Sequence, residues 1–308
     1  MLQTGLFTHR DCSQHEMGSW HPECPERLAA ISDHLISTGL APHLKHFEAP
    51  LASTEALQRA HSADYVARLQ SSVPTEGYRP LDPDTSMNSH SLNAALRAAG
   101  AVVDAADRVV NGEIANAFCA VRPPGHHARK SAAMGFCILN SIAVGARHAC
   151  EALGFERVAI IDFDVHHGNG TEEIFGDDEK VLMASFFQHP FYPYSGTGNP
   201  AKNMVNVPLP AGTKGGVARQ VVDEVWLPRL NEFEPQMIFI SAGFDAHRED
   251  SLGQLGLVEA DYTYITERLM EVADKHADGR IVSSLEGGYN LSALGRSAAA
   301  HVKALARL

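Results

Sequence analysis

The stretch that decides the fold is Val158–Gly170, which reads VAIIDFDVHHGNG. It begins as a run of β-branched and other apolar residues, the pattern of a strand buried on both faces of a sheet. Alternate side chains of an extended strand point to one side, so Asp162, Asp164 and His166 are expected to share a face. Unpaired buried charge is costly, so this group indicates a bound divalent cation. The glycines that follow would let the chain turn away. The alternative is an ordinary strand that ends in a polar turn.

Length and composition limit the class of protein. The 308 residues allow one large or two ordinary domains, and 44% hydrophobic content suffices for a sizeable core. Lys and Arg number 25 against 37 Asp and Glu, a net charge of −12, which argues against nucleic acid as a partner. The five cysteines form no C-x-x-C pair, which favours a reducing cytoplasm over a disulfide framework. Neither a signal peptide nor an apolar run of roughly 20 residues is present, so we expect a cytoplasmic protein without a membrane span.

Outside the opening stretch, predicted strands and helices alternate. Strands are predicted at 5–8, 115–121, 181–187, 204–207, 237–245 and 280–285, and helices at 25–39, 54–70, 91–111, 138–153, 215–232 and 259–277, before a C-terminal helix. No linker or internal repeat interrupts the alternation. We therefore predict a single α/β domain over residues 1–308, with a doubly wound, mostly parallel sheet flanked by helices.

Polar residues that break the hydrophobic pattern follow the ends of separate predicted strands. In chain order they are His126 and His127, then Asp164 and His166, then Asp245, then Tyr289. In open α/β sheets ligands bind at the carboxyl edge of the strands, so these side chains are expected to converge on one site.

Two loops carry further candidate residues. The loop 71–90 holds an acidic pair, Asp82 and Asp84, which could lie at the rim of a site. The loop His9–Arg27 is rich in potential metal ligands, namely Cys12, His15, His21 and Cys24. These four could form a zinc site, but they lack the paired spacing of structural zinc sites, so a loop that lines the mouth of a pocket is the favoured interpretation.

The converging residues predict metal-dependent hydrolysis. Asp164, His166 and Asp245 supply three oxygen or nitrogen ligands and leave a fourth position for water or substrate, as in catalytic zinc sites. The same set would also accept Fe²⁺ or other divalent ions. Such an ion lowers the pKa of bound water towards about 7 and polarises a carbonyl.

Other residues near this centre could transfer protons. His126 and His127 follow a rigid Pro-Pro-Gly turn, and one of them can act as general base and then acid. Asp162 could orient one ring and Asn169 the other. The alternative is a pair of loop histidines with ordinary hydrogen bonds. Tyr289 follows two glycines and could donate its hydroxyl to a developing oxyanion.

Six motifs in combination reveal a family resemblance that spans His9 to about Arg296. They are His21–Arg27 (HPECPER), Arg122–His127 (RPPGHH), Gly135–Cys137 (GFC), Asp162–Gly170 (DFDVHHGNG), Ser241–Asp245 (SAGFD) and Glu286–Tyr289 (EGGY). The chain resembles the zinc-dependent histone deacetylase family, in the class II-like branch that includes many bacterial homologues and deacetylase-like amidohydrolases. The resemblance implies the arginase/deacetylase fold.

By position, the resemblance implies that the three ligands named above bind one zinc ion per chain. His127 would be the general base and acid, and His126 its electrostatic partner, paired with Asp162. Tyr289 would polarise the acyl carbonyl. Asn169 stands where class I members carry aspartate, so His127 lacks a carboxylate partner here, which we interpret as a class II trait.

The resemblance also implies a substrate tunnel. Phe136 and Tyr192 would wall the slot for an acyl-lysine side chain, with Tyr192 in place of the more usual phenylalanine. The other residues assigned to substrate binding are the apolar gatekeeper Leu252, Gly135, Gly287 and a rim aspartate, either Asp82 or Asp84. Glu249 and Asp250 are further candidates for acids at the rim.

Members of the family also hold monovalent cations, usually K⁺. The residues of a site near the zinc map to Asp162, Asp164, His166, Ser185 and Phe186. A second site would use Phe175, Asp178 and Val181.

The leading hypothesis is a zinc hydrolase that removes acetyl or other acyl groups from lysine side chains of proteins. An acetylpolyamine deacetylase would use the same chemistry, but apolar Leu252 offers no charge to hold a distal ammonium, which favours acyl-lysine. A catalytically silent module that binds acyl-lysine is disfavoured because every catalytic position is kept. An arginase-like two-metal enzyme would need further carboxylate ligands beside His166.

Overall fold

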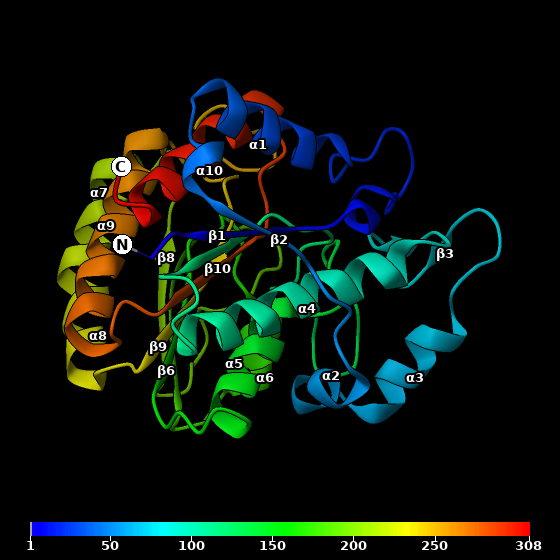
Figure 1. The fold of residues 1–308 in the computed structure, drawn as a ribbon, viewed down its shortest axis with the longest axis horizontal. Helices are drawn as coiled ribbons and strands as arrows, with labels where there is room; N and C mark the ends of the chain where they lie inside the picture. Colours follow the sequence, from blue (N-terminus) through cyan, green and yellow to red (C-terminus); the bar gives the residue numbers. More distant parts are fainter. Residues whose placement is uncertain (1) are drawn as a thin grey trace.

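The computed structural model describes residues 2–308, whose centre is an eight-stranded sheet with parallel neighbours throughout (Figure 1). The strand order is β2-β1-β5-β10-β9-β6-β7-β8. The strands are β1 (Gly5–Thr8), β2 (Lys45–Glu48), β5 (Ala117–Cys119), β6 (Val158–Asp162), β7 (Val181–Gln188), β8 (Met204–Leu209), β9 (Met237–Ala242) and β10 (Ile281–Leu285). Two short strands, β3 (Arg79–Pro80) and β4 (Ser86–Met87), form a separate antiparallel pair. The predicted α/β fold with a mostly parallel sheet is confirmed.

Helices cover both faces of this sheet. On one side α4 (Ser91–Val110) and α5 (Ser141–Glu151) pack on the central strands, whereas α1 (Glu26–Ser37), α9 (Glu259–His276) and α10 (Leu291–Leu305) pack together on the other (Figure 1). The remaining helices are α2 (Thr54–Ala60), α3 (Ala63–Ser71), α6 (Asn169–Phe175), α7 (Gly215–Val221) and α8 (Leu227–Phe233). A π-helical turn, η3 (Val222–Trp226), joins α7 to α8, and η1 (Arg10–Ser13) and η2 (Ala41–His43) are short 3₁₀ helices.

The core lies on both sides of the central strands. Every residue of β6, β9 and β10 is buried, which explains why these strands read as nearly continuous apolar runs. Full burial of one such aliphatic side chain stabilises the fold by roughly 1.5–3 kcal/mol. Helix α5 approaches α4 closely because Gly145 has no side chain: a Cβ there would lie 2.4 Å from Val102.

The helix predicted over 54–70 is wrong in one respect, because it is divided into α2 and α3. Ser62 caps the second helix by accepting a hydrogen bond from the amide of Tyr65 at 3.3 Å. His61 leaves the helix because its ring is used elsewhere. Its Nε2 accepts from the amide of Asn140 at 2.9 Å, and its Nδ1 lies 3.0 Å from the carbonyl oxygen of Arg129. The break therefore anchors the loop that follows β5.

The loop after β6 differs from the prediction. Strand β6 ends at Asp162, so the expectation that Asp162, Asp164 and His166 share one face of a strand is wrong. Instead, Asp162 Oδ1 accepts from the amide of Asp164 at 3.1 Å, and Asp164 Oδ1 accepts from the amide of His166 at 2.9 Å. Such side-chain turns compete with strand pairing and fold the loop back over the sheet edge.

The topology brings four loops together. Strands β5, β10, β9 and β6 are neighbours in the middle of the sheet, and their loops leave from the same carboxyl edge. These loops carry the polar residues of four of the six motifs. The polar side chains converge at this edge because their strands are neighbours. The sequence pattern alone does not give this strand order.

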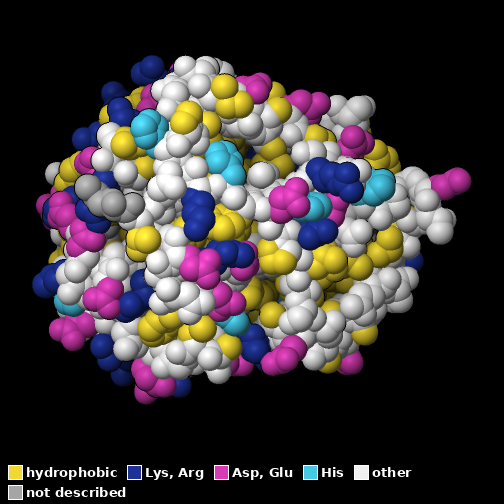
Figure 2. Space-filling view, in the orientation of Figure 1, with side chains coloured by type: hydrophobic (Ala, Val, Ile, Leu, Met, Phe, Trp, Pro, Cys, Tyr) yellow, Lys and Arg dark blue, Asp and Glu magenta, His cyan; other side chains and the backbone are white. Residues whose placement is uncertain are grey.

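The outer surface carries charges of both signs. On the face seen in Figure 2, acidic and basic side chains are intermixed with apolar ones. Among residues 2–308, none of the helices is both long enough and apolar enough to cross a lipid bilayer.

Candidate active site

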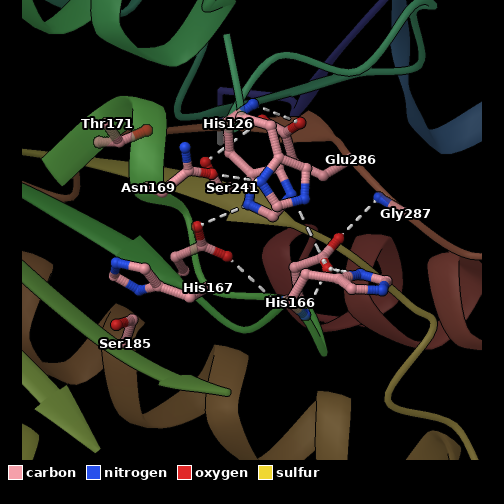
Figure 3. A network of polar contacts seen from close by, with 12 residues as sticks. His126, His166, His167, Asn169, Thr171, Ser185, Ser241, Glu286 and Gly287 are labelled. Carbon is pink, nitrogen blue, oxygen red and sulfur yellow. Dashed lines mark hydrogen bonds and ion pairs between the residues drawn. The ribbon is translucent and has the colours of Figure 1, made fainter. Parts of the chain in front are cut away.

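Three potential metal ligands meet at the carboxyl edge of the sheet. One donor atom each from Asp164, His166 and Asp245 lies within 4.8 Å of the others. His166 Nδ1 is 3.0 Å from Asp164 Oδ1 and 3.2 Å from Asp245 Oδ2. Backbone amides hold the other carboxylate oxygens: Gly287 donates to Asp164 Oδ2 at 2.8 Å (Figure 3), and Val165 donates to Asp245 Oδ1 at 2.9 Å. One oxygen of each carboxylate is thereby directed at the shared imidazole.

The chemistry of these donors fits a cation. Asp245 Oδ2 is buried and makes no hydrogen bond within residues 2–308. Burial and the charge of Asp164 raise the pKa of Asp245 to about 7. Burial lowers the pKa of His166, but its hydrogen bond to Asp164 and the charge of Asp245 outweigh this effect and raise that pKa to about 9. The group thus needs positive charge, and two carboxylates with one imidazole suit zinc with an open coordination position.

Two glycines make room for the carboxylates. A Cβ at Gly243 would lie 2.0 Å from Asp164 Oδ2, and a Cβ at Gly287 would lie 2.0 Å from Asp245 Oδ2. No other residue type fits at either position without displacing a carboxylate. This space requirement explains one glycine in each of the SAGFD and EGGY motifs.

The tandem histidines lie side by side next to this centre, with ring centroids 4.1 Å apart. His126 Nδ1 is 2.9 Å from Asp162 Oδ2, and His127 Nδ1 is 2.7 Å from Asn169 Oδ1 (Figure 3). Burial lowers the pKa of His126, but the carboxylates of Asp162 and Asp164 outweigh it and raise the pKa well above its usual range. Burial and the charge on His126 lower the pKa of His127. The two pKa values are thus shifted in opposite directions, which favours a proton on His126 over one on His127.

Glu286 belongs to the site, although the sequence pattern gives it no role of its own. Its Oε2 accepts from the amide of Gly125 at 2.6 Å. The same oxygen accepts from the amide of His126 at 3.0 Å, and Ser241 Oγ donates to its Oε1 at 3.3 Å (Figure 3). Burial raises the pKa of Glu286 to about 7. The residue fixes the histidine loop against β9 and β10. Its signals in the sequence are its place at the start of the EGGY motif and its position directly after a buried strand.

A cavity of about 270 Å³ opens above these residues. It is lined by Asp84, His127, Gly135, Phe136, His166, Phe191, Tyr192, Ser251, Leu252 and Tyr289. The ring of Tyr192 stands edge-on to His127, with centroids 5.3 Å apart, and Phe136 stands edge-on to Tyr289 at 5.9 Å. Phe191, which the sequence does not single out, stacks on His166 at 5.4 Å. The cavity is therefore an aromatic-walled slot that reaches His166, one of the three potential metal ligands.

The acids proposed for the rim do not all lie there. Asp84 lines the cavity and accepts from the amide of Gly135 at 3.0 Å, whereas Asp82 accepts from the amide of Asp84 at 2.9 Å and does not line it. Glu249 is paired with Arg296 at 2.8 Å. The expectation that Asp250 could serve as a rim acid is wrong, because its side chain is buried.

Asp250 instead joins the tyrosine loop to the gatekeeper. Its Oδ2 accepts from the amides of Tyr289 at 2.6 Å and Asn290 at 2.9 Å, and its Oδ1 accepts from the amide of Leu252 at 2.9 Å. Hydrogen bonds to a charged acceptor contribute roughly 1.5–3 kcal/mol each. One carboxylate thus sets the backbone of two cavity residues from different motifs.

On the hypothesis of a metal-dependent acyl-lysine hydrolase, we expect Asp250→Asn to lower kcat for an acyl-lysine peptide about 10-fold or more with the metal still bound. The carboxamide keeps the size of the side chain but turns an NH₂ donor towards at least one of the three backbone amides. The free-energy cost of the lost hydrogen bond exceeds the roughly 1.4 kcal/mol that corresponds to a tenfold change in rate. Steady-state kinetics and metal content per chain measure this. Glu249→Gln, a change in the adjacent residue, should leave kcat within about twofold; equal effects of both substitutions would contradict this role for Asp250.

The four residues considered as a zinc site in the loop His9–Arg27 do not assemble. Among residues 2–308, the group of Asp164, His166 and Asp245 is the one set of three His, Cys, Asp or Glu donors close enough to share a metal. His15 Nδ1 lies 2.7 Å from Ser91 Oγ, and Cys12 Sγ faces the carbonyl oxygen of Ala94 at 3.9 Å. His21 stands edge-on to Phe136 at 4.6 Å, which agrees with a loop at the mouth of a pocket.

The same loop supplies Glu23 and Arg27 to a buried charge cluster next to Tyr289, which Arg122 of the loop after β5 completes. Arg27 and Arg122 are fully buried and both pair with Glu23. Arg27 Nε donates to the carbonyl oxygen of Gly288 at 2.7 Å, and its guanidinium lies 5.0 Å from the ring centre of Tyr289. These paired buried charges stabilise the observed arrangement of the loop. The hydrophobic pattern of the sequence does not predict such ion pairs.

The residues assigned to monovalent cations lie beside the centre or behind it. Ser185 of β7 pairs with Asp162 of β6 in the sheet register, and Phe186 is buried against Trp226, with ring centroids 5.2 Å apart. Phe175, Asp178 and Val181 lie at the end of α6, in the following turn and at the start of β7.

Comparison with known proteins gives consistent matches. A family model described as the histone deacetylase domain matches residues 21–305. A probable deacetylase from Archaeoglobus fulgidus is 40% identical over 298 residues, which cover 94% of this chain and 82% of the relative. A histone deacetylase-like amidohydrolase from Pseudomonas aeruginosa is 37% identical over 277 residues, 88% of this chain and 73% of the relative.

The solved structures include a close match in shape. A crystal structure of the HDA15 HD domain superposes with a TM-score of 0.92 at 36% identity, and the match covers 99% of this chain and 89% of that one.

Proposed function

This chain belongs to the histone deacetylase family, and from that premise we propose that it is a zinc-dependent hydrolase of acyl-lysine side chains in proteins. The family predicted from the six motifs is the one whose domain model matches residues 21–305. The relatives support a deacetylase or amidohydrolase activity in general terms. Zinc and the lysine substrate are our proposals, as is the assignment of residues 1–308 to one catalytic domain.

One observation carries the proposal. Three residues that could hold a metal lie together, and one of them, His166, lines an aromatic-walled cavity of about 270 Å³ with His127 and Tyr289. An acyl-lysine side chain has an apolar stem and a reactive amide at its tip, so a narrow apolar slot would deliver the amide to these groups. A zinc ion held by Asp164, His166 and Asp245 would supply an activated water molecule and polarise the acyl carbonyl.

The protein's own groups would move protons and hold charge. The lowered pKa of His127 favours its neutral form, which can accept a proton from the attacking water and later give it to the leaving amine. The raised pKa of His126 favours its protonated form, which would place a positive charge between Asp162 and His127. Burial and nearby Asp245 raise the pKa of Tyr289 well above its usual range, so its hydroxyl keeps its proton for the developing oxyanion.

The first experiment is a substrate panel. Purified protein is assayed against acetyl-lysine peptides, longer acyl-lysine peptides, acetylspermidine and acetylputrescine. We expect kcat/KM to be higher for an acyl-lysine peptide than for either polyamine, because Leu252 is an apolar neighbour for the lysine stem. A preference for acetylpolyamines would overturn the substrate proposal and leave the zinc proposal intact.

Leu252→Glu should shift that preference towards polyamines. A carboxylate in a partly solvated cleft interacts with a distal ammonium by about 1–2 kcal/mol, so the ratio of kcat/KM values should change by roughly 5–30-fold. Leu252→Gln is the matched control because it has the same size without the charge. If the glutamine variant shifts the ratio as far as the glutamate variant, charge at this position does not select the substrate.

We also propose that one monovalent cation, K⁺ in the cell, binds beside the zinc at Asp162, Asp164, His166, Ser185 and Phe186. The pairing of Asp162 with Ser185 in the sheet supports this proposal. A catalytically silent acyl-lysine module is a weaker candidate, because a binding module has no need of the proton-transfer groups arranged here.

A further inference from the structure

Three backbone carbonyl groups behind the active site point at one side-chain amide. Asn203, in the turn before β8, directs its Nδ2 at the carbonyl oxygens of Phe175 at 2.8 Å, Asp178 at 3.1 Å and Val181 at 2.9 Å. These are the three residues that the family resemblance assigns to a second monovalent cation. Converging carbonyl oxygens need a positive partner, which is either a cation or the positive end of a polar group.

Neighbouring contacts fix which end of the carboxamide faces the carbonyls. Asn203 Oδ1 accepts a hydrogen bond from the backbone amide of Asp177 at 3.2 Å. In the reversed orientation the NH₂ group would face that amide and Oδ1 would face three carbonyl oxygens. Both contacts would then be repulsive, so the hydrogen-bond network requires Nδ2 to point at the carbonyls.

Two of the three carbonyl oxygens also accept hydrogen bonds from backbone amides. The oxygen of Phe175 accepts from the amide of Asp178 at 3.0 Å, and the oxygen of Asp178 accepts from the amide of Val181 at 3.0 Å. Each carbonyl oxygen has two lone pairs. The two hydrogens of Asn203 Nδ2 can serve as the second donors to Phe175 and Asp178, so the lone pairs of these two oxygens are satisfied without an ion.

A fixed positive charge lies next to this turn. Arg147 Nη1 pairs with Asp178 Oδ2 at 2.5 Å, and Nη2 donates to the carbonyl oxygen of Ile174 at 2.9 Å. Its guanidinium lies 4.5 Å from the ring centre of Phe175. Of the three carboxylates in this turn, Asp177 and Glu179 are exposed, whereas Asp178 is paired with Arg147. A cation among the neighbouring carbonyl oxygens would therefore lie near the positive charge of this guanidinium.

We propose that the Asn203 carboxamide replaces the second monovalent cation, so that this chain has no K⁺ site at Phe175, Asp178 and Val181. The amide joins the end of α6, the start of β7 and the start of β8, the role that the family resemblance assigns to a cation. The inference goes beyond the proposed function and does not depend on the reaction, because its test uses ion positions and stability.

The direct test is a crystal of the whole protein grown in RbCl, with anomalous scattering recorded at the rubidium edge. We expect no peak among the three carbonyl oxygens in the wild-type protein. Asn203→Ala removes the amide and should produce a peak there. A wild-type peak between these oxygens, with the Asn203 side chain turned away or reversed, would overturn the proposal.

Thermal unfolding gives a second readout in solution. In choline chloride, Asn203→Ala should lower Tm by about 2–4 °C relative to the wild-type protein. In KCl the Tm of the variant should rise by more than the Tm of the wild-type protein does, because K⁺ can fill the space that the amide leaves. Asn231→Ala, which removes a carboxamide from α8, is the matched control and should respond to KCl as the wild type does. Equal responses of the wild-type and Asn203→Ala proteins to KCl would contradict the replacement.

Discussion

Asp245→Asn should remove tightly bound metal and lower hydrolysis of an acetyl-lysine peptide by about 10²–10³-fold or more, since breaking a buried charge cluster costs roughly 3–5 kcal/mol. Asp245 Oδ2 lies 3.2 Å from His166 Nδ1 and makes no hydrogen bond within residues 2–308, so a cation is its natural partner. Asparagine keeps the shape and can still accept from the amide of Val165 but lacks the charge. Metal content per chain after dialysis and kcat/KM are the two measurements.

The control for this substitution is another buried carboxylate outside the site. Asp261 of α9 is buried and pairs with Arg219 at 2.6 Å. Asp261→Asn should lower stability but retain metal and activity per folded molecule. If Asp245→Asn kept both a full equivalent of metal and near wild-type kcat/KM, Asp245 would not be a ligand.

Tyr289→Phe should lower kcat by about 10²–10³-fold while the metal stays bound, because one oxyanion donor is lost. KM should change little, since the ring that lines the cavity remains. Tyr262→Phe is a matched control: the Tyr262 hydroxyl is buried on α9 and makes no hydrogen bond within residues 2–308, so its removal should leave kcat unchanged. Near wild-type kcat in the Tyr289 variant would assign oxyanion stabilisation to another group.

The sequence predicts the middle of the sheet well because burial there produces long apolar runs. Strands β6, β9 and β10 begin and end within a few residues of the prediction. The edge strand β2, with sequence KHFE, is largely exposed and shows no apolar run, so its pairing with β1 is a tertiary effect that local pattern does not reveal. The break between α2 and α3 is of the same kind, since His61 is drawn to partners far away in the chain.

The candidate site could be predicted in part for a related reason. Asp164, Asp245 and Tyr289 stand at the ends of strong apolar runs, and parallel strands place such ends at one edge. The alternation of side chains along a strand does not explain the loop after β6. There the side chains of Asp162 and Asp164 accept hydrogen bonds from backbone amides two residues further on and turn the chain. Glu286 and Asp250 act through contacts with backbone amides of distant segments, and the burial of such charged residues leaves no periodic signal.

The most direct measurement treats the purified protein with a chelator and follows zinc content and hydrolysis of an acetyl-lysine peptide in parallel. Three ligands that need a cation predict that both quantities fall together and that one equivalent of Zn²⁺ per chain restores both. Full hydrolytic activity in protein verified to be free of metal would contradict the zinc-dependent deacylase proposed here.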